Sequence, residues 1–324
     1  MTTRHKLALF LALAAPAIML SAAATAADLI RVASGTRGDW DVSVSEFGQK
    51  KGFFRDKGIE LTVNYTDGSG ATLQAVISGS ADIGVAVGVA GFLAPATKGA
   101  PVKLISANYT GAHDLRWYVR NDSPIKSFKD LKETSTVAYS TAGSSTNVAG
   151  LAMLKQAGSK ARMVATGGDT ATLTQVISRQ IDVGYNTDGG LGLGPARDQV
   201  RFIAAGEELA AFRTLTIRAL VANSNDLAKR RDVYVRYMQA YQQTIDWMYE
   251  DPTALQWYAE AKGVSVEEAR RIRDLIYPKE ALRLGPVNQA ELSIQQAVEF
   301  KRIEAPVTMQ EFAKFQDILF NPAK

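Results

Sequence analysis

Short apolar segments of strand character alternate with amphipathic segments of helical character through the first two thirds of the chain. Leu29–Ser34 and Ile59–Tyr65 have the length and alternation of strands, and the segment between them has the pattern of a helix that ends at Gly58. Further strands are expected at 82–88, 102–109, 115–120, 136–143 and 213–223, and the segments 162–166 and 200–205 complete a second set of strands and helices. This order predicts an α/β architecture with mainly parallel sheets flanked by helices.

The last third of the chain has a helical pattern. One face carries mostly large apolar side chains at helical spacing, namely Val233, Tyr237, Tyr241, Ile245 and Met248, which indicates packing against a core rather than a ligand site. Four short motifs predict helix starts: Ser127–Asp130, Ser265–Glu268 and Thr308–Glu311 as capping boxes, and Asp251-Pro252 as an N-cap followed by proline. Gly158 is expected to close a helix.

One segment occurs twice, 100 residues apart. Thr66–Val85 reads TDGSGATLQAVISGSADIGV and Thr166–Tyr185 reads TGGDTATLTQVISRQIDVGY, with ten of twenty positions identical and no gap. Each copy predicts a polar glycine loop, a helix and a strand. The free N–H groups at a helix start attract polar or anionic ligands, and ligands of open α/β sheets lie beyond the carboxyl ends of strands. Two such edges facing each other would form a cleft; the alternative is a pair of ordinary βα units whose glycines only permit turns.

The N-terminal residues and the composition indicate export. Arg4 and Lys6, the apolar stretch Leu7–Leu20 and the small residues Ala22–Ala27 follow the pattern of a signal peptide over residues 1–26, whereas a membrane anchor would need about 20 apolar residues. The formal net charge of the whole chain is +4, and Arg4 and Lys6 account for two of these charges, so no nucleic-acid partner is expected. The sequence contains no cysteine, which excludes disulfides, thiol catalysis and a lipid-modified cysteine. We expect a periplasmic protein without a lipid anchor.

A family resemblance supports this interpretation. The segments GFFRDKGIELTV, LQAVISGSADIGV, KGAPVKLISA, NDSPIKSFKDLKE and VAYSTAGSSTNVAGLAMLKQAG occur in the order found in periplasmic substrate-binding proteins of ABC importers. The chain resembles the branch that binds nitrate, sulfonates, taurine and thiamine-pyrimidine precursors. The resemblance implies a type II periplasmic-binding-protein fold, with lobe one formed by residues 27–115 and 220–324 and lobe two by residues 116–219. Crossover strands are expected near Asp114–Val119 and Leu215–Ala222.

The same resemblance implies ligand-binding positions in both lobes. In lobe one these are Gly38, Asp39, Trp40, Ser69, Gly70, Val87, Gly88 and Val89, and in lobe two Ser144, Ser145, Thr146, Asn147, Asp169, Thr170, Asn186, Thr187 and Asp188. Trp40 is expected either to stack on a ligand ring at the rim or to pack as a surface tryptophan. Ser144–Thr146 could cap a helix, hold an anion, or do both.

The expected ligand is a small organic anion. Arg37, Arg116 and Arg213 are candidate partners for a carboxylate or sulfonate, with solvated surface arginines as the alternative. Asp39, Asp169 and Asp188 instead favour a ligand with donors or some positive character. The resemblance therefore implies a high-affinity solute-binding component that captures a sulfonate, carboxylate or pyrimidine-like ligand and delivers it to an inner-membrane permease, and we expect it to act as a monomer.

Two other functions remain open from the sequence. A periplasmic sensor subunit would have the same features. An enzyme of the same fold would need a nucleophile, a base or a cofactor-binding residue, and the search for such groups finds one histidine, His113, in the mature chain, near the expected hinge. We therefore predict no catalytic residue, no metal site and no cofactor.

Overall fold

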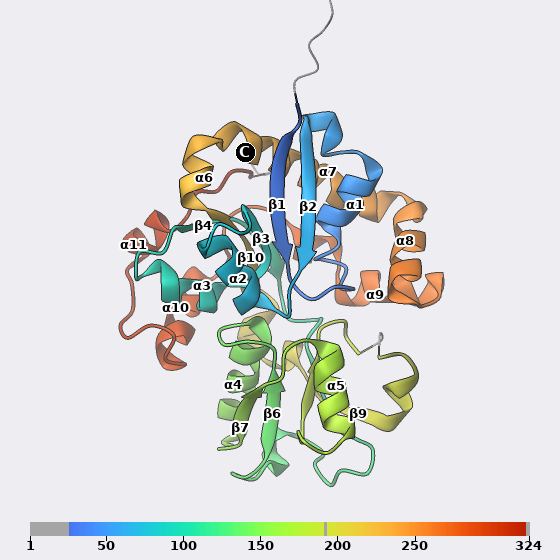
Figure 1. The fold of residues 1–324 in the computed structure, drawn as a ribbon. Coiled ribbons are helices and arrows are strands. Elements are labelled where there is room, and N and C mark those ends of the chain that lie inside the picture. Colours follow the sequence, from blue (N-terminus) through green and yellow to red (C-terminus); the bar gives the residue numbers. More distant parts are fainter. Residues whose placement is uncertain (1–25, 191–192, 322–324) are drawn as a thin grey trace, which may run out of the picture.

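The structure, a computed structural model, describes residues 26–190 and 193–321. The expected signal peptide, residues 1–26, lies outside these ranges except for its last residue. Two lobes, each built on a sheet, stack one above the other in Figure 1. Within the described ranges, no helix is both long and apolar enough to cross a membrane.

The sheet of lobe one has five strands in the order β2-β1-β3-β10-β4. Strands β1 and β2 are parallel, as are β1 and β3, whereas β10 runs antiparallel to both β3 and β4. The strands are β1 (Asp28–Ser34), β2 (Ile59–Tyr65), β3 (Ile83–Gly88), β4 (Val102–Thr110) and β10 (Thr216–Asn223). The helices of this part are α1 (Val44–Lys51), α2 (Ser69–Ile77) and α3 (Val89–Ala96).

The sheet of lobe two repeats this order. Strands β8, β5 and β9 pair in one group and β6 and β7 in another, and a bridge between Val137 and Val183 joins β6 to β8. The resulting order β7-β6-β8-β5-β9 matches that of lobe one, with β5 as the antiparallel strand. The strands are β5 (Arg116–Arg120), β6 (Thr136–Tyr139), β7 (Arg162–Ala165), β8 (Gly184–Asn186) and β9 (Val200–Ala205), and the helices are α4 (Ser145–Ala157) and α5 (Asp169–Ile177).

The chain crosses between the lobes twice, after β4 and after β9. All of β10 pairs within the sheet of lobe one, so the boundary expected between residues 219 and 220 is wrong, because it would divide this strand. The second crossing occupies the segment from Gly206 to Leu215 instead. Strand β5 begins at Arg116, and the first boundary, expected at residue 115, stays a prediction.

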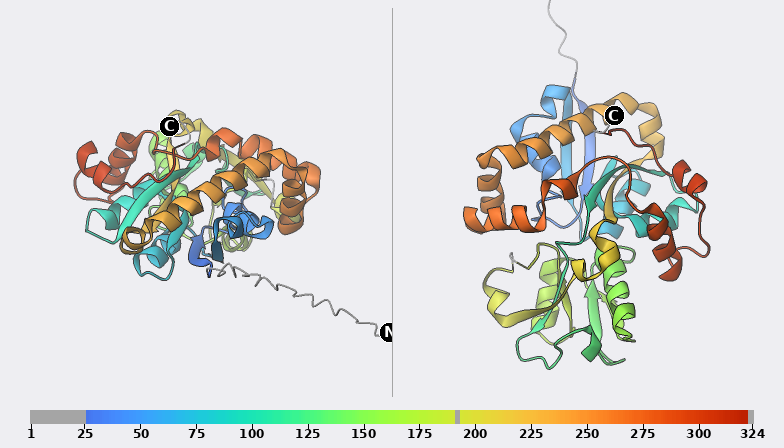
Figure 2. Two further views of the ribbon diagram at one scale, coloured as in Figure 1. Left: turned by 90° about the horizontal axis from the view of Figure 1, so that it is seen from above. Right: turned by 180° about the vertical axis from the view of Figure 1, so that it is seen from behind.

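The remaining helices extend lobe one. They are α6 (Ser224–Lys229), α7 (Arg231–Glu250), α8 (Pro252–Lys262), α9 (Val266–Ile276), α10 (Ala290–Glu299) and α11 (Met309–Lys314). In the view from behind in Figure 2, the orange and red C-terminal helices lie around the upper lobe. Val233, Tyr237, Tyr241, Ile245 and Met248 of α7 are all buried, which confirms the expected core stripe.

Most of the predicted helix ends are present. Ser127 with Asp130 and Thr308 with Glu311 form complete capping boxes, and Asp251 caps the helix that begins at Pro252. Ser265 caps α9 by accepting from the backbone N–H of Glu268, but its own backbone N–H does not donate to the Glu268 side chain. The first helix is shorter than expected: α1 ends at Gly52 in a left-handed conformation, and a separate turn of 3₁₀ helix precedes Gly58.

Candidate ligand-binding site between the lobes

The threonines shared by the two copies of the repeat stabilise the loops themselves. The hydroxyl of Thr66 lies 2.7 Å from that of Thr72, and the hydroxyl of Thr166 lies 2.6 Å from that of Thr172. In each copy the second threonine also donates to the carbonyl of the loop glycine, Gly68 or Gly168. These bonds inside each copy explain why threonine recurs at both positions without invoking a ligand.

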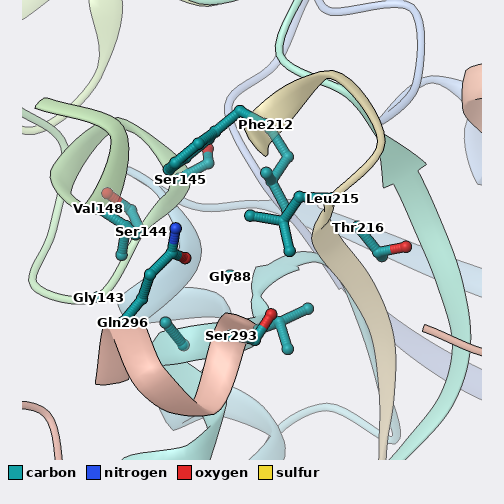
Figure 3. Close-up of a pocket in the computed structure, with 13 residues that line it drawn as sticks. Gly88, Gly143, Ser144, Ser145, Val148, Phe212, Leu215, Thr216, Ser293 and Gln296 are labelled. Carbon is teal, nitrogen blue, oxygen red and sulfur yellow. The ribbon is translucent and has the colours of Figure 1, made fainter. Parts of the chain in front are cut away.

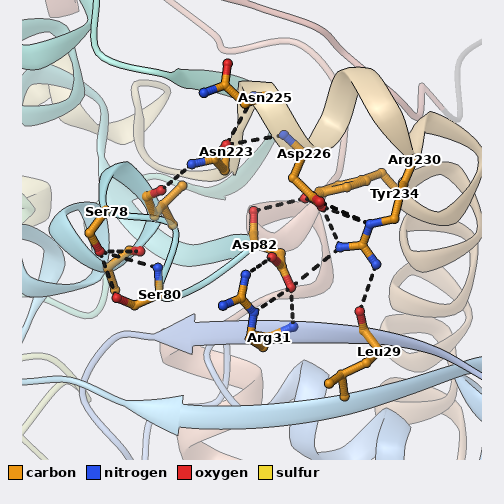
Figure 4. A network of polar contacts seen from close by, with 12 residues as sticks. Leu29, Arg31, Ser78, Ser80, Asp82, Asn223, Asn225, Asp226, Arg230 and Tyr234 are labelled. Carbon is orange, nitrogen blue, oxygen red and sulfur yellow. Dashed lines mark hydrogen bonds and ion pairs between the residues drawn. The ribbon is translucent and has the colours of Figure 1, made fainter.

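The shared aspartate of the repeat has a structural role as well. Asp82 accepts a hydrogen bond of 2.7 Å from the backbone N–H of Arg31, and Asp182 accepts one of 2.8 Å from that of Thr136, at the matching place in lobe two. Figure 4 shows that Asp82 joins the side chains of Arg31 and Arg230 in a polar network. This network lies at the start of β3, away from the strand ends that face lobe two.

Three of the residues at which the copies differ, Ser69, Gly70 and Asp169, lie close to the lobe interface. Ser69 Oγ accepts a hydrogen bond of 2.7 Å from the backbone N–H of Gly88, and the backbone N–H of Gly70 donates to Thr141 Oγ1 of lobe two at 2.9 Å. In the second copy Asp169 accepts from the backbone N–H of Thr187 at 2.9 Å and from its hydroxyl at 3.0 Å. The sequence differences therefore place a hydroxyl in one lobe and a carboxylate in the other.

A small polar cavity lies between these loops. It measures about 40 Å³, where a single water molecule needs roughly 10–15 Å³. Both lobes and β10 line it. The lining residues are Gly35, Thr36, Asp39, Asp41, Val42, Gly68, Ser69, Ala86, Ser140, Ser144, Ser145, Thr146, Tyr185, Thr187 and Arg218. The structure thus brings six of the predicted site residues together: Asp39, Ser69, Ser144, Ser145, Thr146 and Thr187.

A second, smaller space of about 10 Å³ adjoins this cavity and shares Ser144 and Ser145 with it. Figure 3 shows that Phe212 and Leu215 of the second crossing and Gln296 of α10 face it. Gly88 and Val89, two further predicted residues, line it. A Cβ atom on Gly88 would lie 2.5 Å from the carbonyl oxygen of Gly143, so glycine at position 88 allows the two lobes to approach each other this closely.

Arg218 is the basic group of the polar cavity, and two buried carboxylates hold it. Its Nη1 lies 2.6 Å from Asp114 Oδ2 and its Nη2 lies 3.1 Å from Asp41 Oδ2, while the guanidinium stacks 4.4 Å from the ring centre of Tyr109. Burial alone would lower the pKa of Arg218, but Asp114 and Asp41 outweigh it and raise that pKa well above its usual value. Arg218 therefore stays charged, and its charge is compensated within the protein.

A second charged group connects the lobes beside the cavity. Lys262 Nζ of α8 lies 2.7 Å from Asp188 in lobe two and 3.7 Å from Asp39 in lobe one. The Thr187 hydroxyl oxygen lies 2.7 Å from Asp39 and 3.0 Å from Asp169, so its one proton is shared between these two carboxyl groups. The hydroxyl of Tyr277 donates to the carbonyl of Thr187 at 2.5 Å. The two lobes are thus in direct polar contact, in a closed arrangement.

Burial changes the proton affinity of the acidic groups here. It raises the pKa of Asp39 well above the usual range, more than Lys262 lowers it, and burial together with Asp188 raises the pKa of Asp169 to about 6. Burial likewise raises the pKa values of Asp41 and Asp114, although Arg218 opposes this in both. Burial is therefore the largest influence on the pKa of each of these four carboxyl groups.

Trp40 is not at the rim of the cavity. Its side chain is fully buried, with ring centres 5.8 Å from Tyr249 and 5.0 Å from Tyr258, both in edge-to-face geometry. These tyrosines come from the C-terminal helices α7 and α8, which cover the loop after β1. The expectation that Trp40 stacks on a ligand at the rim is therefore wrong. Trp40 is packed against other side chains, as the alternative expected, but in the interior of the protein and not at its surface.

The three arginines proposed as anion partners have protein partners instead. Arg37 is largely exposed, lies 3.5 Å from Glu46 and stacks on Tyr65. Arg116 forms two hydrogen bonds with the carboxylate of Glu207, and Arg213 donates to the backbone carbonyl of the same residue. None of the three lines either cavity.

The other predicted residues surround the site without lining the polar cavity. Asn186 and Asp188 accept hydrogen bonds from the backbone N–H of Gly190, and Asn147 accepts one from that of Gly143. Gly38 accepts a bond from Tyr258, Val87 is buried in β3, and Thr170 is exposed. These residues shape the loops around the cavity.

Sequence reasoning missed Asp41, Arg218 and Lys262. A signal existed for two of them. Asp41 follows Asp39 in the loop GDWDV, and Arg218 interrupts the apolar strand LTIRALVA, where a lone arginine indicates a buried charge with a partner. Nothing in the local pattern marks Lys262, because its partners lie far away in the sequence.

The fold and this interlobe site define a two-lobed binding-protein architecture, and comparisons with known proteins agree. A family model described as NMT1/THI5 like matches residues 47–255, more than half of the chain, so the protein belongs to this family. No curated protein sequence matches the chain.

Solved structures share the fold at low sequence identity. The alkanesulfonate-binding protein SsuA from Xanthomonas axonopodis pv. citri, bound to MOPS, has a TM-score of 0.70 at 17% identity, covering 85% of this chain and 92% of SsuA. The periplasmic nitrate-binding protein NrtA from Synechocystis PCC 6803 has a TM-score of 0.69 at 10% identity, covering 89% and 85%. The desulfurization enzyme DSZB has a TM-score of 0.59 at 14% identity, covering 90% and 96%.

Proposed function

We propose that this protein is the extracytoplasmic solute-binding component of an ABC importer, which captures a small organic ligand between its lobes and delivers it to a membrane permease. The observation that carries the proposal is the polar cavity at the lobe interface, lined by Asp39 and Ser69 from lobe one and by Ser144 and Thr187 from lobe two. The similarity to SsuA and NrtA supports the same function.

The proposed mechanism is closure of the lobes around the ligand. Thr187 and Lys262 already connect Asp39 and Asp188 across the interface. A ligand that bridges both lobes adds contacts only in the closed form and shifts the population toward it. Surfaces of both lobes would then dock on the permease, and the protein would act as a periplasmic monomer.

A sensor subunit would use the same closure, and only the partner would differ. An enzyme of this fold is the third alternative, because DSZB shares the architecture. The described cavity-lining residues include no histidine or lysine, and the sequence contains no cysteine, so the lining offers only hydroxyl groups, two carboxyl groups and one guanidinium for chemistry. This composition favours binding over catalysis.

The proposal can be tested with a thermal-shift screen of the purified protein against small sulfonates, carboxylates, nitrate, pyrimidines and amines. A ligand at 100 times its Kd should stabilise the folded state by about 2.7 kcal/mol. Small-angle scattering with each hit should show lobe closure, and product analysis should show the hit unchanged. Failure of every solute to bind, or turnover of a hit, would contradict the proposal.

A further inference from the structure

The cavity and its immediate surroundings are acidic. Asp39 and Asp41 line it, Asp114 lies behind Arg218, and Asp169 and Asp188 lie behind Thr187. Against these five carboxyl groups stand two basic side chains, Arg218 and Lys262. Carboxyl groups therefore outnumber basic groups at the site.

Neither basic side chain is free to bind an anion. Arg218 contacts Asp114 and Asp41, and Lys262 contacts Asp188 and Asp39, so each cation lies between two carboxylates. Arg218 is the only basic residue among those described as lining the polar cavity. A sulfonate or nitrate placed there would approach Asp39 and Asp41 without gaining an uncompensated positive charge.

Asp41 is paired with Arg218, but its carboxyl oxygens are not fully satisfied. Its side chain is fully buried and lines the cavity, and neither Oδ1 nor Oδ2 accepts a hydrogen bond. Arg218 Nη2 lies 3.1 Å from its Oδ2, and Arg218 together with the backbone N–H groups of residues 41 and 42 opposes the rise in the pKa of Asp41 that burial causes. A buried carboxylate with unsatisfied oxygens is costly, so the missing donor is expected to come from the cavity.

We infer that the ligand carries a positively charged nitrogen group with N–H donors, such as an amidinium or ammonium, and that this group binds Asp41 with Asp39 close by. The inference rests on the proposed solute-binding function and specifies the ligand class. An organic cation or the cationic end of a zwitterion meets the requirement. A metal ion does not fit as well, because among the described residues no three acidic or histidine side chains converge as a metal site.

Pairs of small ions with the same shape and opposite charge test the inference directly. Guanidinium and nitrate are both planar with threefold shape, and acetamidinium and acetate are similarly matched. Isothermal titration calorimetry of the full mature chain, at millimolar concentrations and constant ionic strength set with sodium chloride, would compare the members of each pair. The cation should bind at least about tenfold more tightly than the anion, since a tenfold difference needs only about 1.4 kcal/mol.

A variant that removes the negative charge of Asp41 tests whether this residue binds the cation. Asp41→Asn keeps the side-chain shape and should reduce the preference for the cation about tenfold or more. Asp82→Asn removes a similarly buried, arginine-paired carboxylate far from the cavity and should leave the preference unchanged. If Asp41→Asn does not fold by circular dichroism, Asp39→Asn replaces it, with a reduced cation preference expected.

The outcomes distinguish failure of the inferred ligand class from failure of the proposed solute-binding function. Tighter binding of nitrate or acetate, or an unchanged preference in the Asp41→Asn protein, would overturn the inference and leave the proposed solute-binding function standing. If neither these four ions nor any solute in the thermal-shift screen bound, both would be overturned. A cation preference lost in Asp41→Asn and kept in Asp82→Asn would support both.

Discussion

Lys262 Nζ in lobe one lies 2.7 Å from the carboxylate of Asp188 in lobe two. Both side chains are almost fully buried, and Asp39 lies on the other side of the ammonium group at 3.7 Å. The pair therefore connects the lobes through a charge contact that is shielded from solvent. Removing one partner of such a buried ion pair is destabilising, because it leaves the other charge buried and uncompensated.

Replacing Lys262 by methionine should destabilise the protein by about 3–5 kcal/mol, because Asp188 and Asp39 would lose their counter-charge in a buried place. Urea unfolding measures the change. Lys160→Met is a matched control, since the Lys160–Glu133 pair is 81% and 72% exposed and should contribute about 0–1 kcal/mol. Equal effects of the two substitutions would contradict the buried connection.

Trp40→Ala should cost about 3–5 kcal/mol, because the indole fills a buried site between Tyr249 and Tyr258. Trp40→Phe keeps an aromatic ring there and should bind any ligand found in the screen with unchanged affinity. Thermal unfolding and calorimetry check the two statements. A large loss of ligand affinity in the Trp40→Phe protein at unchanged stability would instead indicate that Trp40 contacts the ligand.

Thr72→Val and Thr172→Val should each cost roughly 0.5–1.5 kcal/mol, because each removes the hydroxyl that bonds Thr66 or Thr166 and a loop carbonyl. Similar losses in the two copies would show that the repeat is a duplicated loop-stabilising unit. Thr170→Val, at an exposed position of the same helix as Thr172, should stay within about 0.5 kcal/mol. If only one of the two substitutions lowered the stability, Thr72 and Thr172 would not have equivalent roles.

Stability should rise as the pH falls from about 7.5 to about 5. The pKa of Asp169 is raised to about 6 and that of Asp39 is raised well above its usual range, so the folded state takes up protons in this window that the unfolded chain does not. Asp251 acts in the opposite direction only below about pH 4, since hydrogen bonds from Thr253 lower its pKa to about 2.

Urea midpoints at pH 7.5, 6 and 5 measure this dependence. Asp169→Asn should flatten it, and the comparison is best made in a His113→Gln background, which removes the histidine 3.6 Å from Glu207. A midpoint that falls between pH 7.5 and 5 in the wild-type protein would contradict the raised pKa values.

The alternation of strands and helices was enough to predict two sheets and the loops at their carboxyl ends. Burial of one face of a strand or helix fixes the spacing of its apolar residues, which is visible in the sequence. Ser69, Ser144 and Thr187 follow from this, since each lies at a helix start or strand end. Trp40 and Lys262 could not be placed in the same way. Trp40 lies in a loop that is covered by tyrosines more than 200 residues later, and the partner of Lys262, Asp188, lies on the other lobe.

The same limit applies to charge. A sequence shows how many arginines and aspartates there are, but not which of them neutralise one another. The sequence analysis selected Arg37, Arg116 and Arg213 as anion partners and did not select Arg218, which stands among apolar residues. Its pairing with Asp114 spans 104 positions, and only the fold brings the two together.

The position of β10 has a consequence for the order in which the protein assembles. This strand lies between β3 and β4, yet it is made after the whole of lobe two. Lobe two has all five of its strands in one continuous stretch, from β5 to β9, and can complete its sheet by itself. Lobe one has a gap in the middle of its sheet until residues 216–223 arrive, so the part of the chain that emerges first is expected to be the part that finishes folding last.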